Sequence, residues 1–140
     1  MLQYKVLDKM CEPKRMRKGD AAFDLCARES VSIPPLGSAK VPLGLCVKLE
    51  QGTFGMLTHR SSMAFGKEVT ASLGIIDENF TGEIHCKLFS HNQNYEVHIA
   101  KGDRVCQMIV QEYLTPEMEE VDEMSDGKDT KAGFGSSGVN

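Results

Sequence analysis

The chain has 140 residues and a mass of 15.5 kDa, a size that fits one compact domain and leaves little room for a second. Its hydrophobic fraction of 41% is enough for a core. A formal net charge of −4 argues against a protein that coats nucleic acid through its phosphates, but it leaves open a small phosphate-bearing ligand in a locally positive pocket.

Apolar side chains at every second position are the clearest local signal, and this pattern predicts extended strands with one buried face. It runs through residues 40–50 and recurs in residues 83–89 and 95–99. Residues 103–114 are apolar on both faces and predict a more buried strand. The predicted inner-face residues are Val41, Leu43, Leu45, Val47, Leu49, Ile84, Cys86, Leu88, Tyr95, Val97 and Ile99.

Turn-forming residues separate these runs, as at Pro34-Pro35, Gly52 and Asp77-Glu78-Asn79. Many short strands at this spacing predict an all-β barrel or jelly roll rather than a parallel sheet with crossover helices. One short helix is predicted across residues 61–69, where the alternation stops.

The composition changes after Pro116, which divides the chain into a β-domain (residues 1–116) and a charged C-terminal arm (residues 117–140). The arm ends in AGFGSSGVN, and its composition alone favours a disordered tail. Phe134, however, is an isolated aromatic residue among glycines and serines, and a plain disordered tail does not explain it.

The five cysteines are odd in number and form no CxxC pair, so we expect free thiols in a reducing compartment. The four histidines show no metal-binding spacing. The N-terminal segment lacks an apolar stretch of signal-peptide length, and no segment approaches membrane-spanning length. These features predict a soluble, intracellular protein of the cytoplasm or nucleus, with neither nucleic acid nor membrane among its partners.

Arg60, Ser61 and Ser62 stand together between a predicted strand and the predicted helix. A guanidinium, two hydroxyls and the amides at a helix start would form a phosphate-binding corner. The alternative is that one of the serines only caps the helix, which is common.

Asp77 stands where an apolar run meets a tight turn. A carboxylate at the mouth of an apolar hairpin can orient and deprotonate a water, although an Asp in such a place more often forms an Asx-turn. Asp24 is a charge inside an apolar stretch, which predicts either a cationic partner, with Arg60 as the candidate, or a role in holding waters on a nucleotide-bound magnesium ion. Gln107 lies in the buried predicted strand, so its amide needs partners: a neighbouring group, a phosphate or a catalytic water.

Five segments resemble, in order and approximate spacing, the five motifs of the trimeric dUTPase family. They lie between residues 21 and 138 and read AAFDLCA, RSSMAFG, GIIDENFTGEI, GDRVCQMIV and GFGSSG. The resemblance implies a jelly-roll-like β-barrel subunit and a homotrimer with active sites at the subunit interfaces. It implies hydrolysis of dUTP to dUMP and pyrophosphate, which lowers dUTP and supplies dUMP for thymidylate synthesis. The implied cofactor is Mg²⁺, bound mainly through the triphosphate and waters, with Asp24 in contact only through water.

The resemblance also assigns roles in the hairpin of the third motif. Gly74, Ile75 and Ile76 would hold uracil largely through backbone groups, and Asp77 would activate the water that attacks the α-phosphorus. Phe80, where the family usually has Tyr, would pack on the deoxyribose.

On the same grounds, Arg60, Ser61 and Ser62 of a neighbouring subunit would bind the phosphates together with Gln107. The catalytic set would be Asp77, Gln107, Ser61 and Asp24. Phe134 would stack over the bound uracil as the arm closes, with Gly135 and Ser136 reaching the substrate.

Three departures from the family pattern affect the site, and one of them is Ala71, in a place where many bacterial members have Asn near the base. Asp129 occupies the position of the Arg that grips the γ-phosphate, which Lys128 or Lys131 would have to replace. His85, a predicted substrate-binding residue, stands where the family often has a Lys directly after the Gly-Glu-Ile sequence. Two alternatives to the hydrolase remain at this point: a dUTPase-like nucleotide-binding trimer that acts through protein partners, and an enzyme of the related dCTP deaminase branch.

Overall fold

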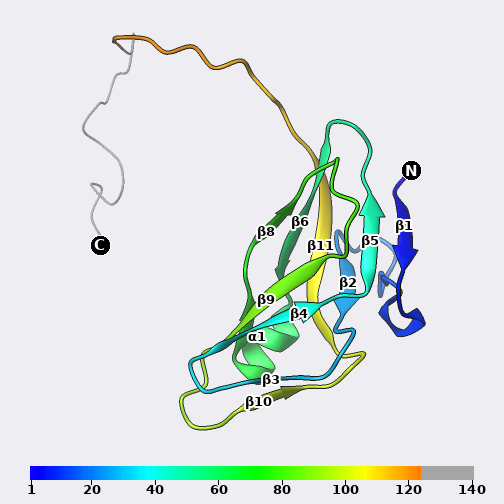
Figure 1. Ribbon diagram of the computed structural model, residues 1–140, viewed down its shortest axis with the longest axis vertical. Helices are drawn as coiled ribbons and strands as arrows, with labels where there is room; N and C mark the ends of the chain where they lie inside the picture. Colours follow the sequence, from blue (N-terminus) through cyan, green and yellow to red (C-terminus); the bar gives the residue numbers. More distant parts are fainter. Residues whose placement is uncertain (124–140) are drawn as a thin grey trace.

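The computed structural model describes residues 1–123, which form a mostly β structure with one short α-helix and one turn of 3₁₀-helix (Figure 1). The elements in chain order are β1 (Gln3–Val6), η1 (Lys9–Cys11), β2 (Phe23–Cys26), β3 (Val31–Ile33), β4 (Ser38–Pro42), β5 (Leu45–Lys48), β6 (Thr53–His59), α1 (Ser61–Lys67), β7 (Val69–Ala71), β8 (Gly74–Ile76), β9 (His85–Ser90), β10 (Val97–Ile99) and β11 (Arg104–Glu112).

The strands pair antiparallel throughout the described residues. A four-stranded sheet has the order β2-β11-β6-β8, and a three-stranded sheet has the order β4-β9-β7. Two further pairs, β1-β5 and β10-β3, complete the body. Within residues 1–123 these sheets do not close into one hydrogen-bonded barrel, but the prediction of an all-β, jelly-roll-like fold is confirmed.

The two larger sheets share a single hydrophobic core. Fully buried side chains come from the four-stranded sheet, such as Leu25 and Leu57, and from the three-stranded sheet, such as Val41 and Leu88. Burial of one face of each sheet against the other is the main stabilising contribution expected in such a two-layer arrangement.

The inner face predicted for residues 40–50 is confirmed, although the single strand is not. Val41, Leu43, Leu45, Val47 and Leu49 are all buried, with at most 5% of any side chain exposed. The strand breaks at Gly44, which has a φ of +61° and leaves no room for a side chain, since a Cβ there would lie 2.9 Å from Cys11 Sγ. β4 therefore ends before this residue and β5 begins after it.

Two other predicted boundaries shift. Tyr95 was expected on an inner face, and this is wrong: its side chain is 60% exposed because β10 begins only at Val97. The side chain of Asn92 makes a turn there, since its Oδ1 accepts hydrogen bonds from the backbone N–H groups of Asn94 and Tyr95, both at 2.9 Å. The predicted helix ends at Lys67, because Glu68 adopts the left-handed conformation that terminates helices.

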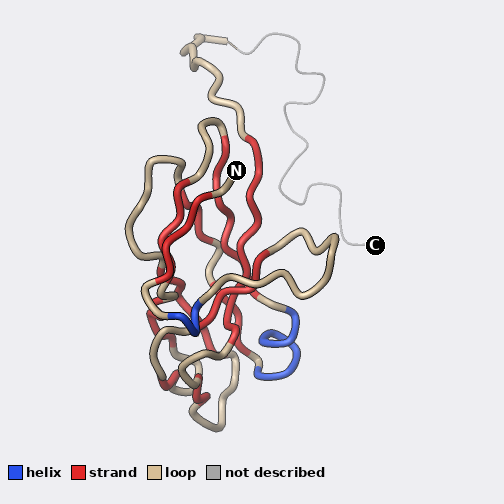
Figure 2. Tube along the Cα trace, turned by 90° about the vertical axis from the view of Figure 1, so that its right-hand side faces the viewer, coloured by secondary structure: helices blue, strands red, loops and turns tan. Residues whose placement is uncertain are grey.

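β11 carries a bulge between Arg104 and Cys106 where it pairs with β2. A bulge changes which side chains face inward, so the consecutive residues Val105 and Cys106 are both fully buried. Hydrogen bonding with Cys86 and burial raise the pKa of the Cys106 thiol well above its usual value. Beyond β11, residues 113–123 leave the body at one end in extended conformation (Figure 2).

Candidate active site

A buried ion pair between Asp24 on β2 and Arg60 after β6 lies at the centre of the first half of the site. Asp24 is only 9% exposed. Arg60 Nε donates to Asp24 Oδ1 at 2.8 Å and Nη2 donates to Oδ2 at 2.9 Å, while Nη1 donates to the Arg104 carbonyl oxygen at 2.9 Å. This two-pronged geometry fixes both groups, and it confirms Arg60 as the cationic partner of Asp24.

Ser61 and Ser62 are the first two residues of α1, directly after this ion pair. Arg60 occupies the N-cap position and makes no capping bond with its side chain, so the alternative in which a serine caps the helix is wrong. Both hydroxyls are without a hydrogen-bond partner within residues 1–123, and both line a cleft. They are therefore free to bind an anion there.

Gln107 lies on β11 between two neighbouring strands, paired with Asp24 on one side and with Thr58 on the other. Its Nε2 donates a hydrogen bond of 3.0 Å to the His59 carbonyl oxygen. The amide is thus held by one backbone contact, with its side chain at the edge of the same cleft.

These residues surround a cleft of about 670 Å³, called here the polar cleft. The structure brings together here the phosphate-side residues that the sequence indicated within residues 1–123. It adds four charged residues that sequence reasoning missed, although the basic run in residues 14–18 was a visible signal. The lining consists of Lys14, Met16, Arg17, Asp20, Ala21, Ala22, Asp24, Arg60, Ser61, Ser62, Arg104, Gln107 and Ile109.

The second half of the candidate site is the turn that follows β8. The hairpin expected here is not formed by β8 and β9, because β8 pairs with β6 in the four-stranded sheet while β9 pairs with β4 and β7 in the three-stranded sheet. Within residues 1–123, β8 is an edge strand of the four-stranded sheet whose one partner is β6, and Ile75 in it is 55% exposed. The Asp77 carbonyl oxygen accepts a hydrogen bond from the Phe80 N–H at 3.0 Å, which closes the turn. The Asp77 side chain is exposed and accepts no hydrogen bond from the described residues, so the Asx-turn alternative is not observed.

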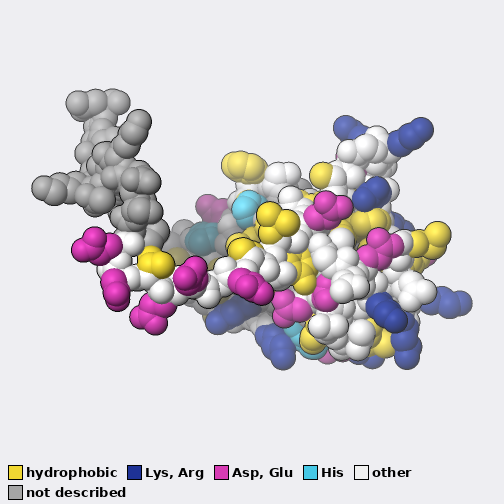
Figure 3. All heavy atoms as spheres, turned by 90° about the horizontal axis from the view of Figure 1, so that it is seen from above, with side chains coloured by type: hydrophobic (Ala, Val, Ile, Leu, Met, Phe, Trp, Pro, Cys, Tyr) yellow, Lys and Arg dark blue, Asp and Glu magenta, His cyan; other side chains and the backbone are white. Residues whose placement is uncertain are grey.

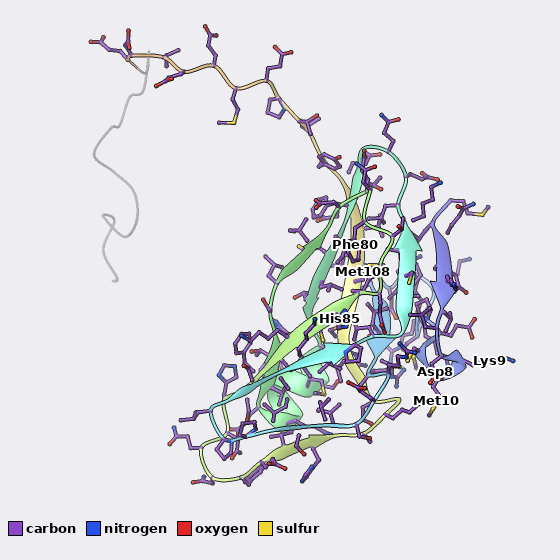
Figure 4. All side chains as sticks on the ribbon, in the orientation of Figure 1. Asp8, Lys9, Met10, Phe80, His85 and Met108 are labelled. Carbon is purple, nitrogen blue, oxygen red and sulfur yellow. The ribbon has the colours of Figure 1, made fainter. Side chains whose placement is uncertain are left out.

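Phe80 folds back over Gly82, where a Cβ would lie 3.0 Å from Phe80 Cζ. Phe80 remains 41% exposed and lines the same cleft as His85 on β9; both are labelled in Figure 4. His85 is held through Nδ1, which lies 3.1 Å from the Glu83 carbonyl oxygen. The resulting cleft of about 300 Å³, called here the hairpin cleft, is lined by Lys40, Ile75, Ile76, Asp77, Phe80, Glu83, Ile84 and His85.

Glu78 anchors the turn that carries Asp77. Its Oε2 accepts a hydrogen bond from the Gly52 N–H in the loop between β5 and β6. A hydrogen bond to Glu78, followed in size by burial and the nearby carboxylates, raises the pKa of the Tyr113 phenol. Tyr113, the first residue after β11, also donates its backbone N–H to the Gly52 carbonyl oxygen at 3.1 Å. Gly52 therefore links the turn that contains Glu78 to the end of β11.

The two clefts lie far apart in a single chain. In the four-stranded sheet β2 and β8 form opposite edges, and Ile76 pairs with Gly55 near the start of β6 while Ser61 follows the end of β6. Each strand residue advances the chain by about 3.3 Å, so Asp77 and Ser61 are roughly 20 Å apart. The two clefts therefore lie too far apart within one chain for Asp77 and Ser61 to contact the same atom of a ligand.

No group of three or more His, Cys, Asp or Glu side chains suitable for a metal ion occurs in the described part of the chain. Asp24 has both carboxylate oxygens engaged by Arg60, yet each oxygen keeps a lone pair that can accept a hydrogen bond from a water. The geometry fits contact with a hydrated cation better than direct coordination. Among residues 1–123, none of the helices has the length and apolar character needed to cross a bilayer.

Three predicted substrate-binding residues, Phe134, Gly135 and Ser136, lie outside the described residues. The same holds for Lys128, Asp129 and Lys131, so the predictions about the arm motif remain predictions.

A jelly-roll-like β fold with a charged cleft of about 670 Å³ is suited to a phosphate-bearing ligand such as a nucleotide. The sequence profile of the dUTPase family matches residues 8–138, and the chain belongs to this family. It is 35% identical over 128 residues to the deoxyuridine 5′-triphosphate nucleotidohydrolase of Solanum lycopersicum, covering 91% of this chain and 75% of that protein. It is 30% identical over 139 residues to the enzyme of the same name from Paramecium bursaria Chlorella virus 1, covering 99% and 98%.

The dUTPase of Staphylococcus bacteriophage 80alpha, solved with dUpNHpp, is a structural relative of the chain. The two superpose with a TM-score of 0.91 at 26% identity, and the match covers 99% of each chain. The likeness therefore extends over nearly the whole chain.

Proposed function

We propose that this protein hydrolyses dUTP to dUMP and pyrophosphate. The observation that carries the proposal is the Asp77 carboxylate, exposed at the mouth of the apolar hairpin cleft and free of hydrogen bonds from the described residues. Its relatives in tomato and in the Chlorella virus are named for this activity, and the phage relative was solved with a dUTP analogue. Removal of dUTP and supply of dUMP for thymidylate synthesis follow from the reaction.

In this proposal Asp77 orients a water and accepts its proton as the oxygen attacks the α-phosphorus. The bond between that phosphorus and the bridging oxygen breaks, and pyrophosphate leaves. Ser61, Ser62 and Gln107 donate hydrogen bonds to the phosphates, and the fixed guanidinium of Arg60 keeps two N–H groups for the same task. Because these donors are already positioned, they require little reorganisation during the reaction.

The hairpin supplies selectivity for the base and the sugar. The backbone of Gly74, Ile75 and Ile76 is proposed to match the hydrogen-bonding edge of uracil. Phe80 is proposed to pack on the deoxyribose, where the ring excludes a 2′-hydroxyl through shape alone. His85 borders the same cleft; because its Nδ1 donates to the Glu83 carbonyl oxygen, the neutral ring presents Nε2 to the substrate as a hydrogen-bond acceptor.

Mg²⁺ is the proposed cofactor, and when bound it would offset the negative charge that develops on the leaving pyrophosphate. Asp24 would accept hydrogen bonds from its waters, in agreement with the engagement of both carboxylate oxygens by Arg60. Asp24 thereby does two things at once: it orients Arg60 and places a negative charge at the edge of the polar cleft.

A homotrimer is the proposed assembly, with each active site formed by the hairpin cleft of one subunit and the polar cleft of its neighbour. The separation of roughly 20 Å between Asp77 and Ser61 supports this, because no rearrangement of side chains spans it. The exposed apolar residues Ile75 and Phe80 are also typical of a surface that another chain covers.

Residues 117–140 are proposed as a C-terminal arm that closes over the site. The part of the arm that the structure describes carries five carboxylates, which are visible as a line of acidic side chains in Figure 3: Glu117, Glu119, Glu120, Asp122 and Glu123. These would repel a triphosphate, so substrate contact is assigned to the last residues, with Phe134 on the uracil and Gly135 and Ser136 beside it. Lys128 or Lys131 is proposed to approach the γ-phosphate in place of the Arg that Asp129 replaces.

All five cysteines are free thiols, which supports the cytoplasm or nucleus as the proposed location.

The test is release of pyrophosphate from dUTP with magnesium, beside dCTP, dTTP and UTP as controls. The proposal expects release from dUTP alone. Ammonia from dCTP would indicate the deaminase branch instead. Binding of dUMP by a folded trimer without any turnover would contradict the hydrolase and support a protein that acts through partners.

A further inference from the structure

The polar cleft contains cationic side chains beyond Arg60, to which the proposed mechanism gives no role. Four Lys and Arg side chains and two Asp side chains line it, which leaves a formal excess of two positive charges. The chain as a whole carries −4. An acidic protein that gathers cations in one cleft has a local potential suited to a polyanion.

Part of this charge is already neutralised. Arg60 and Asp24 compensate each other through their two hydrogen bonds. Arg104 Nη1 lies 3.7 Å from Asp24 Oδ2 and contacts the Met16 sulfur, so Arg104 also belongs to this buried cluster. Lys14 and Arg17 differ, because within residues 1–123 their side chains take part in no ion pair or hydrogen bond.

Backbone hydrogen bonds nevertheless fix the main-chain positions of Lys14 and Arg17. Lys14 exchanges two backbone hydrogen bonds with Asp24, at 2.8 and 3.2 Å. Arg17 stands at the beginning of a closed turn: its N–H donates to Asp20 Oδ2 at 2.8 Å, and the Asp20 N–H donates to the Arg17 carbonyl oxygen at 3.2 Å. Gly19 completes the turn with a φ of +99°. A fixed backbone with free, exposed side chains is suited to binding an incoming ligand.

We propose that Arg17, assisted by Lys14, binds the part of the substrate that leaves as pyrophosphate. This inference rests on the proposed function and assigns to the loop before β2 a role in recognising the polyphosphate. Arg17 provides a planar fork for phosphate oxygens, while Lys14 provides a point charge. The asymmetry predicts the larger contribution from Arg17.

The experiment measures binding of three ligands to the full-length protein by calorimetry: dUpNHpp with magnesium, inorganic pyrophosphate and dUMP. Arg17→Ala is expected to weaken dUpNHpp binding about 10-fold, the effect of losing a hydrogen bond to a charged group, and to weaken pyrophosphate binding similarly. Binding of dUMP is expected to stay within twofold of the unchanged protein. Lys14→Ala is expected to change dUpNHpp binding about 3-fold.

Lys18→Ala is the matched control, because Lys18 lies in the same loop, is exposed and does not line the polar cleft. It removes the same charge from the protein and is expected to leave all three affinities unchanged. Equal losses in Lys18→Ala and Arg17→Ala would mean a general charge effect and would overturn the inference. Thermal unfolding of each variant checks that the loop substitution leaves the fold intact.

Two further outcomes would also contradict the inference: unchanged dUpNHpp binding in Arg17→Ala, or an equal loss of dUMP and dUpNHpp binding. Failure of the unchanged protein to bind dUpNHpp would instead contradict the proposed function. The two failures are therefore distinguishable in one data set.

Discussion

The polar cleft and the hairpin cleft are built on opposite principles. The polar cleft draws on β2, β11 and the end of β6, so its central charges are buried and hydrogen-bonded before any ligand arrives. The hairpin cleft follows an edge strand and exposes apolar side chains together with an unengaged carboxylate. The polar cleft is thus preorganised within one chain, whereas the hairpin cleft leaves its apolar side chains open to a further surface, as the proposed trimer requires.

Asp77→Asn should give the largest effect, because it removes the base from the hairpin half and leaves both clefts in shape. Loss of a general base costs on the order of 10²–10⁴-fold in turnover, and dUpNHpp binding should be retained. Pyrophosphate release and calorimetry separate the two quantities. Glu29→Gln, at an exposed carboxylate outside both clefts, is the control. Normal turnover in Asp77→Asn would remove Asp77 from the mechanism.

Deletion of residues 133–140 tests whether the hairpin half is completed by the arm. We expect turnover to fall on the order of 10²-fold, since the substrate would be less well positioned and less shielded from water. The assembly mass, measured by light scattering, should not change. An unaltered rate would show that the arm is not part of the site.

Asp24→Ala tests the preorganisation of the polar half through stability. Asp24 and Arg60 have side chains that are only 12% and 19% exposed, so removing one partner leaves a poorly solvated charge. The expected cost is about 3 kcal/mol in the free energy of unfolding, measured by urea denaturation. The double variant Asp24→Ala/Arg60→Ala should lose less than the sum of the single variants. Additive losses would argue against a coupled pair.

Tyr113→Phe gives the smallest expected effect and tests whether the Tyr113 hydroxyl stabilises the turn through Glu78. The pKa of Tyr113 is raised above its usual value near 10 by the hydrogen bond to Glu78. A raised folded-state pKa contributes stability that is present below the unfolded pKa and lost as the pH rises through the folded value. The unchanged protein should therefore lose stability as the pH rises above about 10, and Tyr113→Phe should lose less.

The pKa of the Cys106 thiol is also raised, so both proteins lose the same amount of stability from this group above about pH 9. The difference between the urea midpoints of the two proteins therefore reports Tyr113 alone. Identical pH profiles would mean that the phenol makes no contribution to the turn.

Much of the site was visible in the sequence because its signals are local. The serines follow Arg60 directly, and Asp77 follows an apolar run into a turn, so residue type and spacing were enough to nominate them. The sequence does not assign Lys14 and Arg17 to the site. They reach the polar cleft because the loop before β2 lies beside the start of α1, and no local sequence pattern predicts that contact. Tyr95 was misplaced since the side-chain turn at Asn92 delays β10 by two residues.

The sequence by itself determined the inner faces of the strands apart from Tyr95, the short helix and the membership of the dUTPase family. These follow from side-chain period, turn chemistry and motif order, all of which are properties of neighbouring residues. Only the tertiary structure decided that β2 and β8 form opposite edges of one sheet and that the two clefts lie roughly 20 Å apart. It also decided that Arg60 donates two hydrogen bonds to the Asp24 carboxylate. Strand order depends on pairing between distant segments, and that pairing is chosen by burial of the whole core rather than by any one motif.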